Sequence, residues 1–133
     1  MSAVIDPAGL AARWFHRAQS DLRGAKYYLS LAAPDDLENS CSHCQQAAEK
    51  ALKGFLVLHS IFFRKSHDLD YLRNLCEGTG ISFASISQDC KDLTPYADSR
   101  YPEYDDISED EAKEALQKAE KVFTFCHNLF VST

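Results

Sequence analysis

Apolar side chains recur in steps of three and four along most of the chain, the spacing of one face of an α-helix. The clearest run lies in the middle of the first half and comprises Cys41, Cys44, Ala48, Ala51, Leu52, Phe55 and Leu58. This run predicts a long helix from about Asp36 to His59. Because several of these residues are small, a neighbouring helix can approach this one closely.

Four further segments show helical spacing. We expect helices from about Leu10 to Leu31, from about Asp68 to Cys76, from Ser82 or Phe83 to about Arg100, and from Ser108 to about Phe130. Pro95 lies inside the fourth of the five predicted helices and should kink or split it at Thr94-Pro95, because proline lacks the N–H that a helix needs. Ser108 followed by Glu111 is a capping box and marks the start of the last helix.

These elements predict an all-α protein. No segment alternates apolar and polar residues for long enough to indicate a strand. The link between the first two helices has only a few residues, so they should be antiparallel neighbours. We therefore expect an antiparallel up-and-down bundle of four long helices plus one short helix. It should form one domain over residues 10–131, after a flexible lead-in at residues 1–9.

Two of the predicted long helices carry polar side chains at regular helical spacing. Gln45, Glu49 and Lys53 follow one another at steps of four on a polar strip of the second helix, where Glu49 and Lys53 can form a helical ion pair. The polar side of the first helix is basic and comprises Arg13, Arg17, Arg23 and Lys26.

The charge is unevenly distributed. The formal net charge is −6, yet residues 1–66 carry eight Lys and Arg against six Asp and Glu, and residues 67–133 carry six against fourteen. An acidic second half argues against a surface that binds nucleic acid as a whole. Any phosphate site should therefore be a local cluster of cations.

The sequence favours a cytoplasmic protein. No apolar run approaches the ~18 residues of a membrane span, and the first residues lack the layout of a signal peptide. The five cysteines are an odd number inside helical patterns, which favours buried reduced thiols. Cys41-Ser42-His43-Cys44 also has the chemistry of a metal ligand set, but no second such pair exists. We assign no metal and no cofactor.

Two turns are candidate phosphate sites. Arg64-Lys65-Ser66-His67 places two cations and an imidazole before a predicted helix N-terminus, which attracts anions. Arg100-Tyr101-Pro102 offers a guanidinium for phosphate and a ring for a base. Lys50 and Lys53 would extend the basic patch. The alternatives are a solvated turn at residues 64–67, an ion pair of Arg100 with nearby aspartates, solvated lysines, and structural roles for His43 and His59.

Several segments together resemble the HEPN domain family, whose acronym refers to a nucleotide-binding domain of higher eukaryotes and prokaryotes. The run Cys-Gln-Gln-Ala-Ala-Glu-Lys-Ala-Leu-Lys at 44–53 is similar to the family's second helix, and Ser66-His67-Asp68-Leu69 to its Thr/Ser-His-Asp-Leu turn. Residues 99–102 are similar to its Arg-Tyr-Pro segment. The final capped helix with Ala-Glu at 119–120 completes the pattern, over about residues 10–130.

The resemblance implies a helical bundle, commonly a homodimer, with a link to nucleotide or RNA chemistry. Many members pair with a minimal nucleotidyltransferase, often as a toxin–antitoxin system, and others are metal-independent ribonucleases. The ribonucleases use an Arg followed four to six residues later by His on the late helix. This chain lacks that motif: Lys121 replaces the Arg before His127, and the two lie on different helical faces, with His127 expected to be partly buried.

Three hypotheses follow. The first is a HEPN-type module that binds a nucleotide or RNA, or that serves as the partner of a nucleotidyltransferase. The second is a ribonuclease with a variant site, in which His67 transfers the proton and Arg100 stabilises the phosphate charge. The third is a purely structural dimeric interaction protein.

Overall fold

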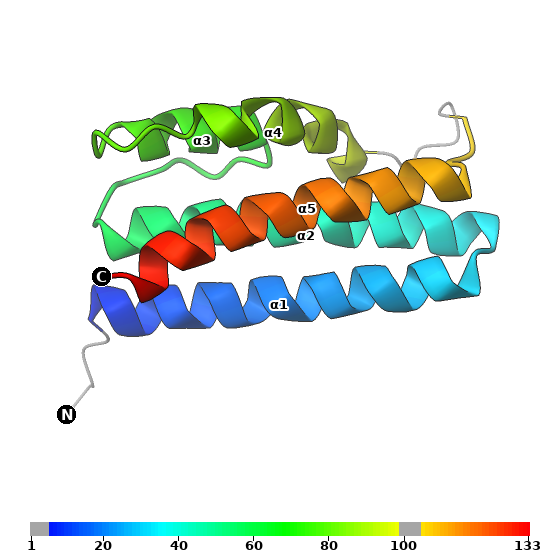
Figure 1. Ribbon diagram of the computed structural model, residues 1–133, viewed down its shortest axis with the longest axis horizontal. Coiled ribbons are helices and arrows are strands. Elements are labelled where there is room, and N and C mark those ends of the chain that lie inside the picture. Colours follow the sequence, from blue (N-terminus) through cyan, green and yellow to red (C-terminus); the bar gives the residue numbers. More distant parts are fainter. Residues whose placement is uncertain (1–5, 99–104) are drawn as a thin grey trace.

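The computed structural model describes residues 6–98 and 105–133. Within these ranges the chain is helical and contains no strand, as the sequence predicts. Three long helices, α1 (Pro7–Leu31), α2 (Pro34–Leu58) and α5 (Glu109–Val131), run along the molecule (Figure 1). The short helices α3 (Leu69–Glu77) and α4 (Ser87–Leu93) cover one side of this group (Figure 1). The bundle architecture is thereby confirmed.

The ends of the first two helices follow from local chemistry. Asp6 caps α1 by accepting a hydrogen bond from the Gly9 N–H at 2.6 Å, and Pro7 opens the helix, three residues before the predicted start. Pro34 opens α2 in the same way, so Asp35 lies in the first turn and does not cap it. Ala32, in the left-handed region with φ 60°, reverses the chain between them. The two helices consequently run antiparallel.

The predicted fourth helix is divided. A 3-10 turn at Ala84–Ile86 leads into α4, which stops at Leu93, and a second 3-10 turn, η2, spans Thr94–Ala97. The break lies at the predicted Thr94-Pro95 step, since Pro95 cannot donate the hydrogen bond that would continue the α-helix. The described part of this segment ends at Asp98, beside α2.

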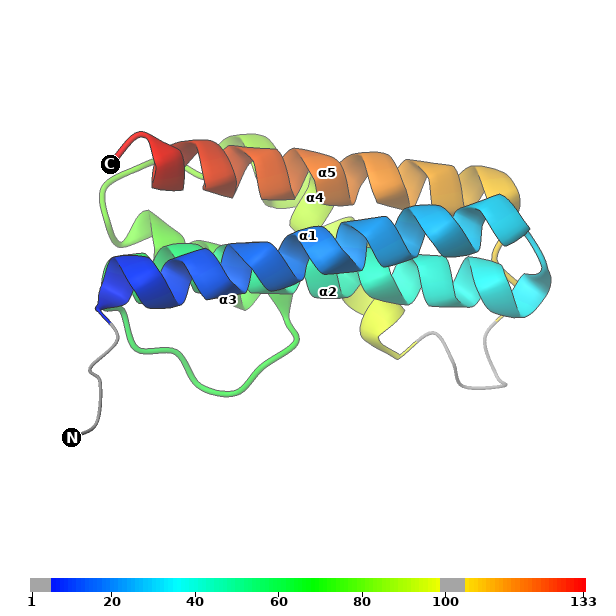
Figure 2. The same cartoon turned by 90° about the horizontal axis from the view of Figure 1, so that it is seen from below.

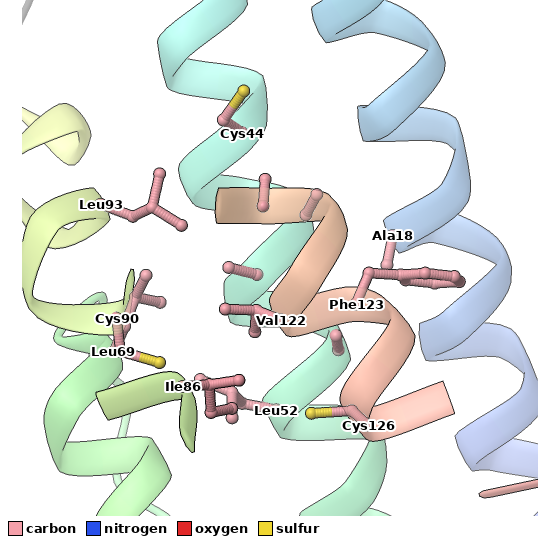
Figure 3. Packing of buried hydrophobic residues seen from close by; sticks show 14 of the residues in the cluster. Ala18, Cys44, Leu52, Leu69, Ile86, Cys90, Leu93, Val122, Phe123 and Cys126 are labelled. Carbon is pink, nitrogen blue, oxygen red and sulfur yellow. The ribbon is translucent and has the colours of Figure 1, made fainter. Parts of the chain in front are cut away.

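Helix α2 is the centre of the molecule and contacts α1, α3, α4, η2 and α5. Side chains from all these helices meet in one core, part of which Figure 3 shows around Leu52, Ile86 and Val122. Phe15 of α1 stacks on Phe130 of α5 at 4.9 Å between ring centroids, so the C-terminus lies beside the start of α1 (Figure 1). Among the described residues no helix has the length and apolar content needed to cross a membrane.

Two glycines allow α1 and α2 to approach closely along their length (Figure 2). A Cβ atom at Gly54 of α2 would lie 3.0 Å from Phe15 Cε2 and 3.2 Å from Trp14 Cβ. A Cβ atom at Gly24 of α1 would lie 3.3 Å from the ring of His43. Glycine lowers the stability of a helix interior, but at Gly24 it makes room for the ring of His43.

We predict that Gly54→Val destabilises the protein by about 1–3 kcal/mol, because the added methyl groups overlap the aromatic side chains of α1. Urea denaturation followed by circular dichroism measures the change. The control is Gln117→Val, at an exposed position of α5, which should change the unfolding free energy by less than about 0.5 kcal/mol. Equal effects of the two substitutions would show that Gly54 does not determine the distance between the helices.

Candidate functional site

The polar strip of α2 lies inside the structure, covered by the segment between α2 and α3. Glu49 is 8% exposed and accepts three hydrogen bonds: from Gln45 Nε2 at 3.1 Å and from Lys53 Nζ at 3.0 Å, and its Oε1 lies 2.7 Å from His67 Nδ1. Gln45 Nε2 also donates to the backbone carbonyl of His67 at 3.1 Å. This network fixes the position of the turn that carries His67.

Opposing effects set the ionisation of Glu49. Burial alone would raise the pKa of this carboxyl group, but the hydrogen bonds from His67, Gln45 and Lys53 outweigh it and lower the pKa below its ordinary value. Lys53 itself is 7% exposed and lies under two aromatic rings, 6.0 Å from the centroid of Trp14 and 5.6 Å from that of Phe63. Lys53 and Glu49 therefore act as a structural ion pair.

A second buried carboxylate belongs to α1. Asp21 is 6% exposed; its Oδ1 lies 2.9 Å from His43 Nδ1, and its Oδ2 accepts a hydrogen bond from Lys50 Nζ at 2.6 Å. The ring of His43 stacks on Tyr28, with 5.6 Å between the centroids. Asp21 thus ties α1 to α2 and determines where the ammonium group of Lys50 lies.

Two pockets lie on either side of Lys50. The first, which we term the His67 pocket, has a volume of about 400 Å³ and is lined by Ser42, Gln45, Gln46, Glu49, Lys50, His67, Ala97 and Asp98. The second, the arginine pocket, has a volume of about 700 Å³ and is lined by Ala12, Arg13, His16, Arg17, Ser20, Asp21 and Lys50. Since Lys50 lines both, the two pockets adjoin.

The arginine pocket is the more cationic of the two. Arg13 and Arg17 are one helical turn apart, exposed, and make no ion pair or hydrogen bond with any described residue. With Lys50 they supply three cations against the single carboxylate of Asp21. The His67 pocket instead contains two carboxylates, Glu49 and Asp98, and one lysine. The local excess of positive charge therefore lies at the arginine pocket.

The structure separates the cations that the sequence groups together. Lys50 and His67 line the same pocket, whereas Lys53 is buried and forms an ion pair with Glu49. Arg64 lies over the ring of Tyr71, 3.7 Å from its centroid, and Lys65 is exposed. Arg100 and Tyr101 lie outside the described residues, so their assignment to a phosphate or catalytic site stays a prediction. The same holds for a proton-transfer role of His67, whose side chain is 65% exposed.

Other candidate chemistries have structural roles. All five cysteines are buried as free thiols, as expected, and burial raises the pKa of Cys41 and of Cys90 to about 12. His127 is half-buried between Phe15 and Phe123 of α1 and α5, whereas Lys121 pairs with Asp89 of α4 at 3.0 Å. The two residues thus lie on different faces of α5, as the sequence indicates.

Sequence reasoning did not identify Arg13, His16 and Arg17 as site residues. The available signal was the basic side of the first predicted helix. This side lines a pocket only because α1 packs with it next to Lys50 of α2, which depends on how the helix is rotated in the bundle.

We predict that Glu49 makes the stability of the protein depend on pH. The carboxylate has a lowered pKa in the folded state, so its contribution is present above the ordinary carboxyl pKa of 4.5 and is lost as the pH falls through the lowered value. Glu49→Gln should be destabilised at pH 7, because Lys53 keeps a buried charge, and should lose less stability than the wild type between pH 5 and pH 3. Urea denaturation across this range measures both effects.

Glu114→Gln, at an exposed position, is the control and should follow the wild type. Parallel pH profiles of the wild type and Glu49→Gln would contradict the prediction.

Comparisons with known proteins agree with the architecture. The family model of the HEPN domain matches residues 11–129. The crystal structure of ST0689, an archaeal HEPN homologue, superposes with a TM-score of 0.71 at 24% identity and covers 90% of this chain and 97% of its own. TT1696 from Thermus thermophilus gives a TM-score of 0.73 at 27% identity, over 89% and 96% of the two chains. A search of curated proteins gave no match. Because the family match spans almost the whole bundle, the chain belongs to the HEPN domain family.

Proposed function

We propose that this protein is a HEPN-type binding module that holds a phosphate group of a nucleotide or RNA in the arginine pocket. The observation that carries the proposal is the pair Arg13 and Arg17, without a partner among the described residues, beside Lys50. Among the described residues neither guanidinium group is engaged in an ion pair or hydrogen bond, so both are available to a ligand. Their planar forks match the oxygens of phosphate.

The electrostatics of the molecule support a site of limited size. The chain as a whole is acidic, with a formal net charge of −6, and repels polyanions over most of its surface. In the arginine pocket the three cations outnumber the one carboxylate, and Asp21 holds the ammonium group of Lys50 in place. A phosphate bound there can therefore meet three cations, of which Lys50 is already held in place.

Replacing both arginines should abolish most binding and preserve the fold. We predict that Arg13→Ala/Arg17→Ala weakens binding of ATP, GTP or a short RNA at least about tenfold, since each charge-assisted hydrogen bond contributes about 1.5–3 kcal/mol. Isothermal titration calorimetry measures the affinity, and ligand-dependent thermal stabilisation provides a second readout.

A variant that loses the same charge elsewhere distinguishes binding at the arginine pocket from nonspecific attraction of the anionic ligand to the protein surface. Arg23→Ala/Lys113→Ala removes two exposed cations outside the arginine pocket and should keep nearly the wild-type affinity. If both double variants bind as the wild type does, or if both lose affinity equally, the arginine pocket is not the phosphate site.

The proposal extends to partners. We place the module as a homodimer that pairs with a minimal nucleotidyltransferase in a toxin–antitoxin-like system, as the family resemblance implies. Large apolar side chains available for such contacts are Tyr27 and Leu31 near the end of α1, and Phe62, which is 88% exposed in the segment after α2. We predict that a tagged chain co-purifies with a nucleotidyltransferase of its source organism and that Phe62→Ser reduces the recovery. Recovery of no nucleotidyltransferase would remove this part of the proposal.

A further inference from the structure

We propose that the His67 pocket binds a guanine base, and that Asp98 is the residue that selects it. This inference rests on the proposed function, because the base belongs to the ligand whose phosphate lies in the arginine pocket. The two pockets adjoin at Lys50, so one ligand can occupy both.

The charges of the two pockets differ in a way that suits the two parts of a nucleotide. Three cations line the arginine pocket against one carboxylate, whereas two carboxylates and one lysine line the His67 pocket. A second phosphate in the His67 pocket would face Glu49 and Asp98 and be repelled. A neutral group that donates hydrogen bonds avoids this repulsion, and a nucleobase with adjacent donors is such a group.

In the part of the chain that the structure describes, only one of the two carboxylates is available to such a group. Glu49 is buried and already engaged by Gln45, Lys53 and His67. Asp98 is exposed at the end of η2, and its carboxylate accepts no hydrogen bond from a described residue. Since its two oxygens lie side by side, it can accept two parallel hydrogen bonds.

This geometry distinguishes among the RNA bases. The Watson–Crick edge of guanine presents two adjacent donors, N1–H and the N2 amino group. Adenine and cytosine place an acceptor nitrogen beside their amino group, and uracil has one N–H between two carbonyl groups. A carboxylate can therefore form a bidentate pair with the Watson–Crick edge of guanine alone.

Further features of the pocket support a base. His67 presents an imidazole that is 65% exposed, and its bond to Glu49 fixes the ring, which then provides a surface for stacking. Gln46 donates its amide N–H to Ser42 at 3.2 Å and adds a further polar group to the wall. The volume of about 400 Å³ lies in the range of small-molecule sites.

Exchanging the carboxylate for an amide tests the inference by a change of specificity. Asp98→Asn retains one acceptor and replaces the other oxygen with a donor. The variant amide matches xanthine, which has N1–H beside a C2 carbonyl. We expect the wild type to bind GTP roughly tenfold or more tightly than ATP, ITP or XTP, since a good bidentate pair discriminates by about this factor. Asp98→Asn should lose the preference for GTP and bind XTP more tightly than GTP.

The controls distinguish the base site from the phosphate site. Asp105→Asn removes an exposed carboxylate that does not line the His67 pocket and should retain the preference for GTP. Inorganic pyrophosphate contacts only the phosphate site, so Asp98→Asn should bind it as the wild type does. Short RNAs that end in guanosine or adenosine, titrated in parallel, decide whether a free nucleotide or an RNA end is the better source of the base.

Isothermal titration calorimetry with these ligands measures the affinities that distinguish the base site from the phosphate site. Equal affinities for GTP, ATP and XTP in both proteins, with pyrophosphate still bound, would overturn the base site and leave the phosphate site intact. Failure of the wild type to bind pyrophosphate and every nucleotide would overturn both proposals. Loss of the preference for GTP together with a gain for XTP in Asp98→Asn would establish the base site.

Discussion

The enclosure of α2 is the constraint on which the rest of the structure depends. This helix contacts every other helix of the bundle, so the polar side chains on it are also removed from water. A buried charge or amide is costly unless it has a partner inside the protein. Ser40, Gln45, Glu49 and Lys53 all have such partners, and no buried polar side-chain atom in the described part of the chain lacks one.

These internal partners determine which groups remain for a ligand. The carboxylate of Glu49 holds the turn with His67 against α2, and Asp21 of α1 binds Lys50 and His43 from the opposite side. Lys53 is buried and paired with Glu49, so it is not available to a ligand. Among the described residues, Arg13 and Arg17 have no ion-pair or hydrogen-bond partner, and Asp98 accepts no hydrogen bond. The groups that we assign to a ligand are thus those that the packing of α2 does not require.

The fold was largely predictable because it follows from local patterns. Helical periodicity located the five helices to within a few residues at most ends, and the Thr94-Pro95 break followed from the chemistry of proline. The predicted starts of α1 and α2, at about Leu10 and Asp36, lie later than the observed Pro7 and Pro34, because proline interrupts the helical pattern of the sequence although it is favoured at the first position of a helix. The candidate site is harder to predict. The sequence singles out Lys50 and His67, but it shows Arg13 and Arg17 only as part of the basic side of a helix. Which of these cations are buried or placed together depends on contacts between residues far apart in sequence, such as Asp21 with Lys50 and Glu49 with His67.

The central claim is that a phosphate binds between α1 and α2, and nuclear magnetic resonance can locate it directly. Inorganic pyrophosphate would be titrated into the ¹⁵N-labelled protein while the side-chain N–H signals of the arginines are followed. The account predicts saturable shifts of the Arg13 and Arg17 signals, with those of Arg23 and Arg73 unchanged. Saturable shifts confined to Arg64, or no saturable shift of any arginine, would contradict it.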